Sequence, residues 1–353
     1  MKSHKKKFFL LCLIIWILFT SGCSSPQKGV DSLSEFAAGN DAVNNNSAAY
    51  PKSRDTIISF VPKSLDNPVF LDAKEEAERV CKELGVKFEW LGPMQTDSRE
   101  QELIVESLIR RKVDGIVISC VDPGRMKKVI DKAVDAGIKV ATFDSDSPDS
   151  KRLFYCGTNN YAAGKACGTE LEKILEWKKK GKEELKVLVM TADKGSFNLN
   201  ERLRGFEETT KNSNIRLEVI DTLYCQDDIN IAGEILEGYM RNNEDVDIFF
   251  STGGWPLIVP SDSMPRFQRW CKNDGISIVI DTFYPMVVAA KKGMADALVG
   301  QNFKKMGELS VRNLYRAIKG ESIHTYFIDT GLELGNSENY DILLQSKKSW
   351  EIK

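Results

Sequence analysis

The chain has 353 residues, of which 42% are hydrophobic and 28% are charged, and its formal net charge is −2. This balance is typical of a globular protein and excludes a disordered or fibrous chain, and the length is sufficient for two domains. Because there is no excess of basic residues, we expect no nucleic-acid partner.

The first 22 residues have the pattern of a secretory signal peptide. Four lysines precede an apolar run over Phe8–Phe19, which is shorter than the roughly 20 residues that a membrane-spanning helix needs. Removal of residues 1–22 takes away these lysines and no acidic residue, so the formal net charge falls from −2 to about −6. We therefore expect a mature protein that acts outside the cytoplasm.

The stretch TSGC, which ends at Cys23, resembles the lipobox of bacterial lipoproteins, with Thr20 where a leucine is usual. The resemblance implies that Cys23 becomes the N-terminal residue and carries a lipid that anchors the protein to the cell membrane. A plain signal peptide with an incidental cysteine is the alternative. Residues 23–54 are rich in Ser, Asn, Ala and Gly, which predicts a flexible tether.

Beyond residue 54, short apolar strands alternate with amphipathic helices. In the first half, strands are predicted over 56–61, 86–91, 114–119 and 138–143, and helices over 68–84, 99–112 and 124–136. In the second half, helices are predicted over 160–178, 200–211, 229–241, 257–273 and 285–292, and strands over 185–190, 215–220, 246–250, 276–280 and 296–300. A helix to about Lys319 and a strand over 325–329 follow. This alternation predicts the α/β class, with two doubly wound parallel-sheet lobes.

Polar side chains gather where the predicted strands end, and in such sheets ligands bind outside the carboxyl ends of the strands. They are Lys63, Asp66, Asn67, Ser119, Cys120, Asp122, Asp144, Ser145, Asp146, residues 191–200, Asp227, Asp228, residues 253–255, Asp281, Gln301 and Asn302. Carboxylates and carboxamides suit the hydroxyl groups of a polyol, and the rings of Phe70 and Trp255 suit the apolar face of a sugar. Taken singly, each polar residue is more often a cap or turn residue, and Asp66 or Asn67 before Pro68 has the pattern of a helix cap.

From Asp55 to about Asn339 the chain resembles the type I periplasmic sugar-binding proteins, the ribose-binding-protein-like solute-binding lipoproteins of ABC transporters. The resemblance rests on KSLDNPVF, DGIVIS, VATFDSD, NERLRGF, IVID and KGESIHTYFIDTGLEL, in this order. It implies ligand contacts from Lys63, Asn67, Val69, Phe70, Asp144, Ser145, Asn200, Asp228, Gly253, Asp281 and Gln301. The types of Ser145, Asn200, Asp228 and Gly253 differ from those of ribose binders, which argues against ribose itself. Trp255 is expected to supply the ring absent at Asp228, and Gly253 and Gly254 to let the backbone approach the ligand; a tight turn with Trp255 in the core is the alternative.

The resemblance also implies two lobes, 55–158 plus 301–328 and 159–300 plus 329–353, which close on the ligand about a hinge of three crossings near Thr158, Gln301 and Asp329. The implied function is to bind a monosaccharide or related polyol and deliver it to an ABC permease, as a monomer and with no cofactor, metal or catalytic residue. Presentation of the bound form to a membrane sensor kinase or chemoreceptor is the alternative. FVPK and DSD also resemble the autoinducer-2 receptor, but Asn198 and Leu199 stand where that receptor has an acid and an amide.

An enzyme and a transcription regulator are less consistent with the sequence. After removal of the signal peptide, His324 is the one remaining histidine, predicted on the last strand, and there is no phosphate loop, nucleophile elbow or metal-ligand spacing. A regulator of the lac-repressor type would begin with a helix-turn-helix. Six cysteines remain beside Cys12 and Cys23 and show no CxxC pair, so most are expected to be small buried hydrophobic residues, with a disulfide left open.

Overall fold

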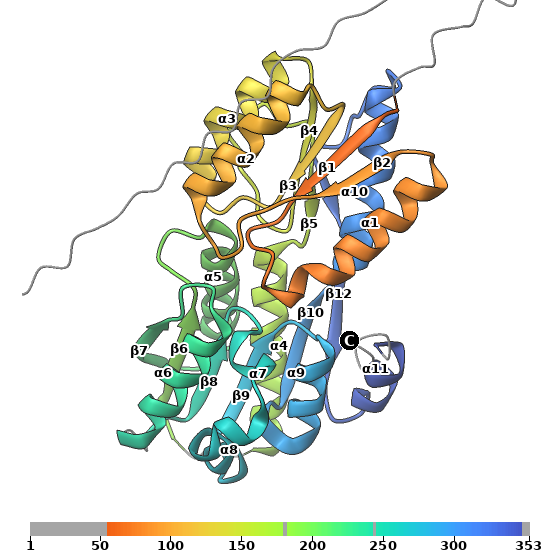
Figure 1. The fold of residues 1–353 in the computed structure, drawn as a ribbon. Coiled ribbons are helices and arrows are strands. Elements are labelled where there is room, and N and C mark those ends of the chain that lie inside the picture. The colour runs from red at the N-terminus through yellow and green to blue at the C-terminus, as the bar shows by residue number, and fades with distance from the viewer. Residues whose placement is uncertain (1–54, 179–181, 243–244, 348–353) are drawn as a thin grey trace, which may run out of the picture. The chain divides into compact units, whose positions relative to one another are not determined.

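Two six-stranded sheets, each covered by helices, form the part of the chain described in the computed structural model, which comprises residues 55–178, 182–242 and 245–347 (Figure 1). These described residues all belong to one compact unit. The predicted signal peptide (1–22), the tether (23–54) and Cys23 lie outside the described residues. Among the residues described, no helix is both long enough and apolar enough to cross a membrane.

The first sheet is parallel throughout and has the strand order β11-β5-β4-β3-β1-β2. Its strands are β1 (Ile57–Val61), β2 (Lys87–Trp90), β3 (Gly115–Ile118), β4 (Lys139–Phe143), β5 (Tyr155–Gly157) and β11 (Phe327–Asp329). A 3-10 turn, η1 (Pro68–Phe70), leads into α1 (Leu71–Glu83), which packs against α10 (Phe303–Ile318), while α2 (Ser98–Arg111) packs against α3 (Pro123–Asp135). All four residues of β3 are buried, as expected for a central strand with helices on both faces.

The second sheet has the strand order β12-β10-β9-β8-β6-β7, which is equivalent to that of the first sheet when the strands of each sheet are counted along the chain. Its strands are β6 (Leu185–Thr191), β7 (Leu217–Tyr224), β8 (Ile248–Ser251), β9 (Ile276–Ile280), β10 (Ala297–Gln301) and β12 (Leu332–Gly335). Its helical segments are α4 (Asn160–Trp177), α5 (Phe197–Asn212), α6 (Ile229–Asn242), α7 (Trp255–Ile258), η2 (Ser261–Ser263), α8 (Pro265–Lys272), α9 (Tyr284–Ala289), η3 (Ala290–Met294) and α11 (Tyr340–Ser346). The α/β class and the two doubly wound sheets predicted from the sequence are confirmed.

Several predicted elements differ from those observed. Strands β5 and β12 and helix α11 were not predicted, and β12 runs antiparallel to β10, so the second sheet is not purely parallel. The single helix predicted over 257–273 is three segments, because prolines at 260 and 265 interrupt the hydrogen bonds of a continuous helix. The helix predicted over 285–292 ends as a π turn in which Gly293 has φ 84°. His324 precedes β11 in a loop and is exposed.

The chain passes between the two sheets three times. The connections are residues 158–159 between β5 and α4, residue 302 between β10 and α10, and residues 330–331 between β11 and β12. The backbone N–H of Thr330 donates to the carbonyl of Gly157 at 2.9 Å, so two of the crossings are bonded to each other. The crossings lie at or beside the positions predicted for a hinge, whereas the hinge motion and the lobe boundaries remain predictions.

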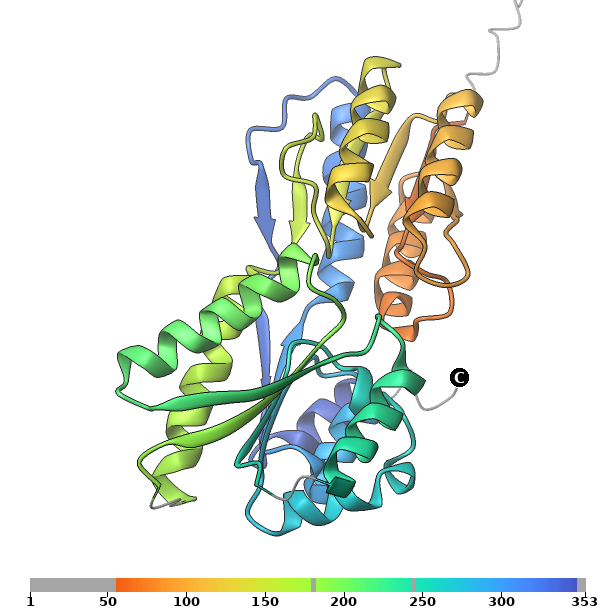
Figure 2. The ribbon, with the colours of Figure 1, turned by 90° about the vertical axis from the view of Figure 1, so that its left-hand side faces the viewer.

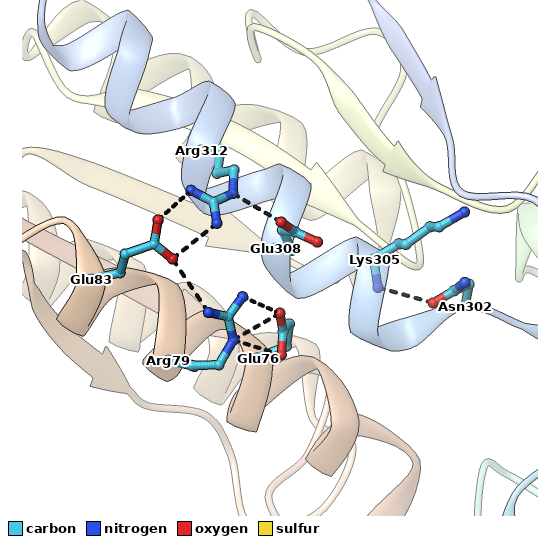
Figure 3. Close-up of polar contacts among 7 residues, drawn as sticks. All are labelled: Glu76, Arg79, Glu83, Asn302, Lys305, Glu308 and Arg312. Carbon is cyan, nitrogen blue, oxygen red and sulfur yellow. Dashed lines mark hydrogen bonds and ion pairs between the residues drawn. The ribbon is translucent and has the colours of Figure 1, made fainter. Parts of the chain in front are cut away.

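Helix α10 is held closely against α1, which fixes the segment that follows the second crossing. A Cβ atom at Gly307 would lie 2.3 Å from the carbonyl oxygen of Ala73, so the two helices approach more closely than a side chain at this position would allow. Arg312 also forms a two-pronged ion pair with Glu83, with both N–O distances 3.0 Å (Figure 3). We use the word lobe below for each sheet with the helices packed on it.

All six cysteines among the described residues are buried and unpaired, namely Cys81, Cys120, Cys156, Cys167, Cys225 and Cys271. Burial raises the pKa of Cys81 and of Cys225 to about 12. Their expected role as small buried hydrophobic residues is confirmed.

Candidate ligand-binding site

The carboxyl ends of strands from both sheets converge on one space between the lobes, which we call the inner cavity. In each sheet the order reverses beside the first strand of its lobe, β1 or β6, which is the place where doubly wound sheets bind ligands. The inner cavity has a volume of about 40 Å³. Its lining residues come from both lobes and are Lys63, Asn67, Val69, Phe70, Asp144, Asn198, Leu199, Arg202, Asp227, Gly253, Gly254, Trp255, Asp281, Gln301 and Phe303.

The structure brings together seven of the nine ligand-binding residues predicted in the sequence analysis. They are Lys63, Asn67, Phe70, Asp144, Trp255, Asp281 and Gln301. Val69 and Gly253, which the family resemblance also implied, line the cavity as well. Asn200 and Asp228, the other two of the nine, do not line the inner cavity.

Asn67 combines the two roles that the sequence left open. Its Oδ1 accepts from the backbone N–H of Val69 at 3.2 Å and so caps the turn η1, as the cap pattern predicted. Its side chain also lines the inner cavity. Nearby Lys63 is only 7% exposed, and its Nζ has no hydrogen-bond or ion-pair partner among the described residues. A nearly buried ammonium group is unfavourable without a partner, so this arrangement favours a ligand that accepts hydrogen bonds.

Three aspartates line the inner cavity, and all three have left-handed backbone conformations. The φ angles are 55° for Asp144, 61° for Asp227 and 91° for Asp281. Such angles are uncommon outside glycine and occur often at functional sites. Burial raises the pKa of Asp227 and of Asp281 above the usual aspartate value. Three carboxylates held in this way form a set of acceptors for hydroxyl groups.

Each of the aspartates at the ends of β4 and β9 is oriented by other polar groups. Oδ2 of Asp144 accepts from the hydroxyl of Ser119 at 2.6 Å. Oδ1 of Asp281 accepts from Nε2 of Gln301 at 2.8 Å, and its Oδ2 accepts from the backbone N–H of Gly254 at 3.2 Å. A carboxylate offers about four lone-pair sites, so both residues retain acceptor capacity for a ligand.

Trp255 forms an aromatic wall whose position depends on two glycines and on Asp227. Its Nε1 donates to Oδ1 of Asp227 at 2.7 Å, and its ring folds over Gly253, where a Cβ atom would lie 2.5 Å from the ring. A Cβ atom at Gly254 would lie 2.6 Å from Sδ of Met286. The glycines thus make room for these side chains, and both also line the inner cavity, where the expected approach of their backbone to the ligand remains a prediction.

The sequence analysis placed Asn198 and Asp227 among the polar side chains at the strand ends but did not assign them as ligand residues, and it did not include Arg202. All three line the inner cavity. Arg202 is 2% exposed; its Nε donates to Oδ1 of Asn160 at 2.9 Å and its Nη1 to the carbonyl of Thr252 at 2.8 Å. Its Nη2 is buried and has no partner among the described residues. Because α5 begins at Phe197, positions 198 and 202 lie one helical turn apart on the same face. The predicted helix began at 200 and left position 198 out, so this spacing was not recognised in the sequence.

Asn200 and Asp228 have roles outside the inner cavity. Asn200 is exposed on α5, and its Nδ2 donates to the carbonyl of Lys194 at 3.1 Å. Oδ1 of Asp228 accepts from the backbone N–H groups of Asn230 and Ile231 at 2.7 and 3.0 Å, so Asp228 caps α6. The neighbouring Asp227 takes the place in the cavity that was expected for Asp228, because its left-handed turn directs its carboxylate to Trp255.

Close packing of α4 and α5 determines where Arg202 lies (Figure 2). A Cβ atom at Gly164 would lie 1.9 Å from the carbonyl oxygen of Arg202, and one at Gly205 would lie 2.2 Å from that of Tyr161. Glycines on both helices therefore permit an approach that any side chain would prevent.

A larger groove of about 610 Å³ lies between α5 and the edge of the second sheet and includes Phe206, Leu217 and Val219. It is away from the carboxyl ends of the strands. None of the buried polar atoms that lack a partner among the described residues belongs to its lining, whereas three of them line the inner cavity. The inner cavity is therefore the candidate site.

Two doubly wound lobes with a polar and aromatic cavity between them define a two-lobed ligand-binding protein. The family model described as a periplasmic binding protein domain matches residues 58–322. The chain belongs to the periplasmic binding protein family, and the resemblance to its type I sugar-binding members that was noted in the sequence is confirmed. The family is periplasmic and thus extracytoplasmic.

Individual relatives agree with this assignment. The chain is 31% identical over 160 residues to the D-ribose/D-allose-binding protein of Pseudomonas aeruginosa, a region that covers 43% of this chain and 48% of that protein. The matches to this and to another curated relative thus span about half of those proteins' lengths.

Solved structures match over nearly their whole length. An ABC transporter solute-binding protein from Burkholderia graminis C4D1M in complex with D-arabinose is 28% identical with a TM-score of 0.74, covering 82% of this chain and 98% of that one. XylFII in its complex with LytSN is 26% identical with a TM-score of 0.70, covering 81% and 99% of the two chains. The first of these relatives is a solute-binding protein, which fits the expectation that the chain is not an enzyme.

Proposed function

We propose that this protein binds a monosaccharide or related polyol between its two lobes, outside the cytoplasm, and delivers it to an ABC permease. The observation that carries the proposal is a set of three buried polar atoms without a partner among the described residues, all in the inner cavity: Oδ1 of Asn198, Nη2 of Arg202 and Oε1 of Gln301. An unpaired buried polar group destabilises the fold by about 1–3 kcal/mol, so such a set is best explained by a ligand that pairs with all three.

The composition of the cavity favours an uncharged polyol. Each hydroxyl can donate to one of the three carboxylates and accept from Arg202 or Lys63. Three carboxylates face two cationic side chains, so an anionic ligand would add repulsion. The rings of Phe70 and Trp255 are suited to the apolar faces of a sugar ring. In this proposal Asn198, Arg202 and Asp227 join the predicted ligand residues, and Asn200 and Asp228 leave them.

Ligand entry requires the lobes to separate, because the inner cavity has only about 40 Å³. We propose that the lobes, with the predicted boundaries 55–158 plus 301–328 and 159–300 plus 329–353, rotate about the three crossings. Small-angle scattering should give a larger radius of gyration without sugar than with it. An unchanged radius at proven saturation would contradict the hinge.

A thermal-shift screen of the mature protein over pentoses, hexoses, inositols and autoinducer-2 tests the proposed ligand class, followed by calorimetric titration of each hit. A ligand at 100 times its Kd stabilises the folded state by about 2.7 kcal/mol, which is measurable as a rise of several degrees. A response to autoinducer-2 alone would replace the proposal by the autoinducer alternative. No response to any sugar or inositol would refute it.

The membrane anchor is a separate part of the proposal and rests on the TSGC stretch that ends at Cys23. Cys23→Ala should release the protein from the membrane fraction or leave it unprocessed. Normal cleavage with unchanged membrane retention would contradict the anchor, without bearing on ligand binding.

A sensing role is the second candidate, in which the protein presents its sugar-bound form to a membrane sensor kinase or chemoreceptor. It is favoured by the likeness to XylFII, which was solved in complex with LytSN. Deletion of the gene distinguishes the roles: loss of sugar uptake supports transport, and intact uptake with loss of sugar-dependent gene expression or chemotaxis supports sensing.

A further inference from the structure

A second recess, which we call the outer cleft, lies directly outside the inner cavity. It has a volume of about 400 Å³, which is within the range of roughly 300–1,000 Å³ that small-molecule sites occupy. Asp66, Pro68, Gln95 and Thr96 line it from the first lobe, and residues 226–231 line it from the second. The candidate monosaccharide site described above does not use this space.

The outer cleft and the inner cavity share two side chains, Asn67 and Asp227. Asn67 is 7% exposed, and its Nδ2 has no partner among the described residues, although its Oδ1 is bonded to Val69. The carboxylate of Asp227 accepts from Nε1 of Trp255 at 2.7 Å on one oxygen and from the hydroxyl of Thr96, in the opposite lobe, at 3.4 Å on the other. The two spaces thus share two polar side chains.

The outer cleft has the chemistry of a further polyol site. The side chains of Asp66, Gln95, Gln226 and Asn230, two from each lobe, have no hydrogen-bond partner within the described part of the chain. They offer a carboxylate and three amides to hydroxyl groups, and the lining contains no lysine or arginine. Pro68 on one side and Ile229 and Ile231 on the other offer apolar surface to the C–H faces of a ring.

We propose that the outer cleft is a subsite for a second sugar ring, so that the ligand class includes a disaccharide or glycoside with one ring in the inner cavity and the next between Gln95 and Asn230. The link between the rings passes Asn67 and Asp227. This inference rests on the proposed function, because the first ring is the sugar that the inner cavity binds.

Calorimetric titration of the mature protein with matched pairs of sugars tests the inference. The pairs are D-xylose and xylobiose, L-arabinose and arabinobiose, D-glucose and cellobiose, and D-galactose and β-1,4-galactobiose. Gln95→Ala and Asn230→Ala remove side chains of the outer cleft that are exposed and have no partner in the described residues, so both variants should fold normally. Gln345→Ala, an exposed amide on α11 away from both spaces, is the matched control.

For at least one pair we expect the disaccharide to bind about 10-fold or more tightly than its monosaccharide, as two or more added hydrogen bonds would give. Each outer-cleft variant should weaken disaccharide binding by about 3- to 10-fold and change monosaccharide binding less than 2-fold. Gln345→Ala should change neither.

Two results would overturn the subsite and leave the proposed function intact: monosaccharide binding with rejection of every corresponding disaccharide, or disaccharide binding that neither outer-cleft variant weakens. If no sugar of any kind binds, the proposed function and the subsite both fail.

Discussion

Replacing Asn198 by alanine should strengthen the ligand-free fold and weaken sugar binding. Asn198 is the second residue of α5 and is 5% exposed, and its Oδ1 is buried without a partner among the described residues. The side chain therefore carries an unpaired acceptor while the ligand is absent. A sugar hydroxyl would donate a hydrogen bond to this acceptor.

The size of both effects follows from the unpaired acceptor. Leaving a buried acceptor unpaired costs about 1–3 kcal/mol, and loss of side-chain packing offsets part of this when the amide is removed. We expect the free energy of unfolding of the ligand-free protein to rise by about 1 kcal/mol, which raises Tm by about 2–4 °C. Loss of one neutral hydrogen bond to the ligand, about 0.5–1.5 kcal/mol, should raise Kd about 2- to 12-fold.

Calorimetric scanning without ligand and titration with the sugar found in the screen measure the two effects. Ser277→Ala is the matched control, because Oγ of Ser277 is fully buried on β9 without a partner among the described residues and does not line the inner cavity. It should raise Tm in the same way and leave Kd unchanged. If Asn198→Ala lowers Tm and changes Kd less than 2-fold, the amide is structural and the reasoning is wrong.

Three further predictions concern the carboxylates and the helix packing. Asp144→Ala and Asp281→Ala should each raise Kd by roughly 10- to 100-fold or more in titrations of folded protein, because each loses a charge-assisted hydrogen bond of about 1.5–3 kcal/mol; binding within 3-fold of wild type would show that these groups do not hold the ligand. Burial raises the pKa of Asp281 above its ordinary value of 3.8, so the folded state binds more protons than the unfolded state. The stabilising contribution of this group is therefore present below about pH 4 and is lost as pH rises through the folded-state pKa. The Tm of Asp281→Asn should therefore rise relative to wild type between pH 4 and pH 7, and a constant difference would contradict the raised pKa. Gly164→Ala should destabilise the protein by at least about 1–3 kcal/mol and weaken sugar binding, because the new Cβ would lie 1.9 Å from the carbonyl oxygen of Arg202. Gly238→Ala, in a helix with nothing within 4 Å of the new atom, should stabilise the protein by about 0.5–1 kcal/mol. Equal effects of the two changes would refute the packing argument.

Local pattern was sufficient to predict the two-sheet architecture and several residues of the candidate site. The apolar run at 115–118 and the mainly apolar run at 276–280 can be recognised as strands because both faces of each strand are buried. Lys63, Asp144 and Asp281 could be assigned to the site because a residue that directly follows such a strand must lie at the ligand-binding edge of the sheet. At these positions the strand that precedes the residue in the sequence is also the strand that fixes its place in the fold.

Tertiary structure decided the features that depend on contacts between residues far apart in the sequence. Strands β5 (Tyr155–Gly157) and β12 (Leu332–Gly335) contain no continuous apolar run of the kind at 115–118, and they form by pairing with β4, β11 and β10. The choice of Arg202 and Asn198 over Asn200, and of Asp227 over Asp228, depends on where α5 begins and on a left-handed turn. Those in turn depend on contacts far along the chain, such as that of Gly164 with the backbone of Arg202. A shift of one residue turns a side chain on a helix by about 100°, so the sequence by itself determined which strand ends form the candidate site, and only packing decided which side chains face the inner cavity.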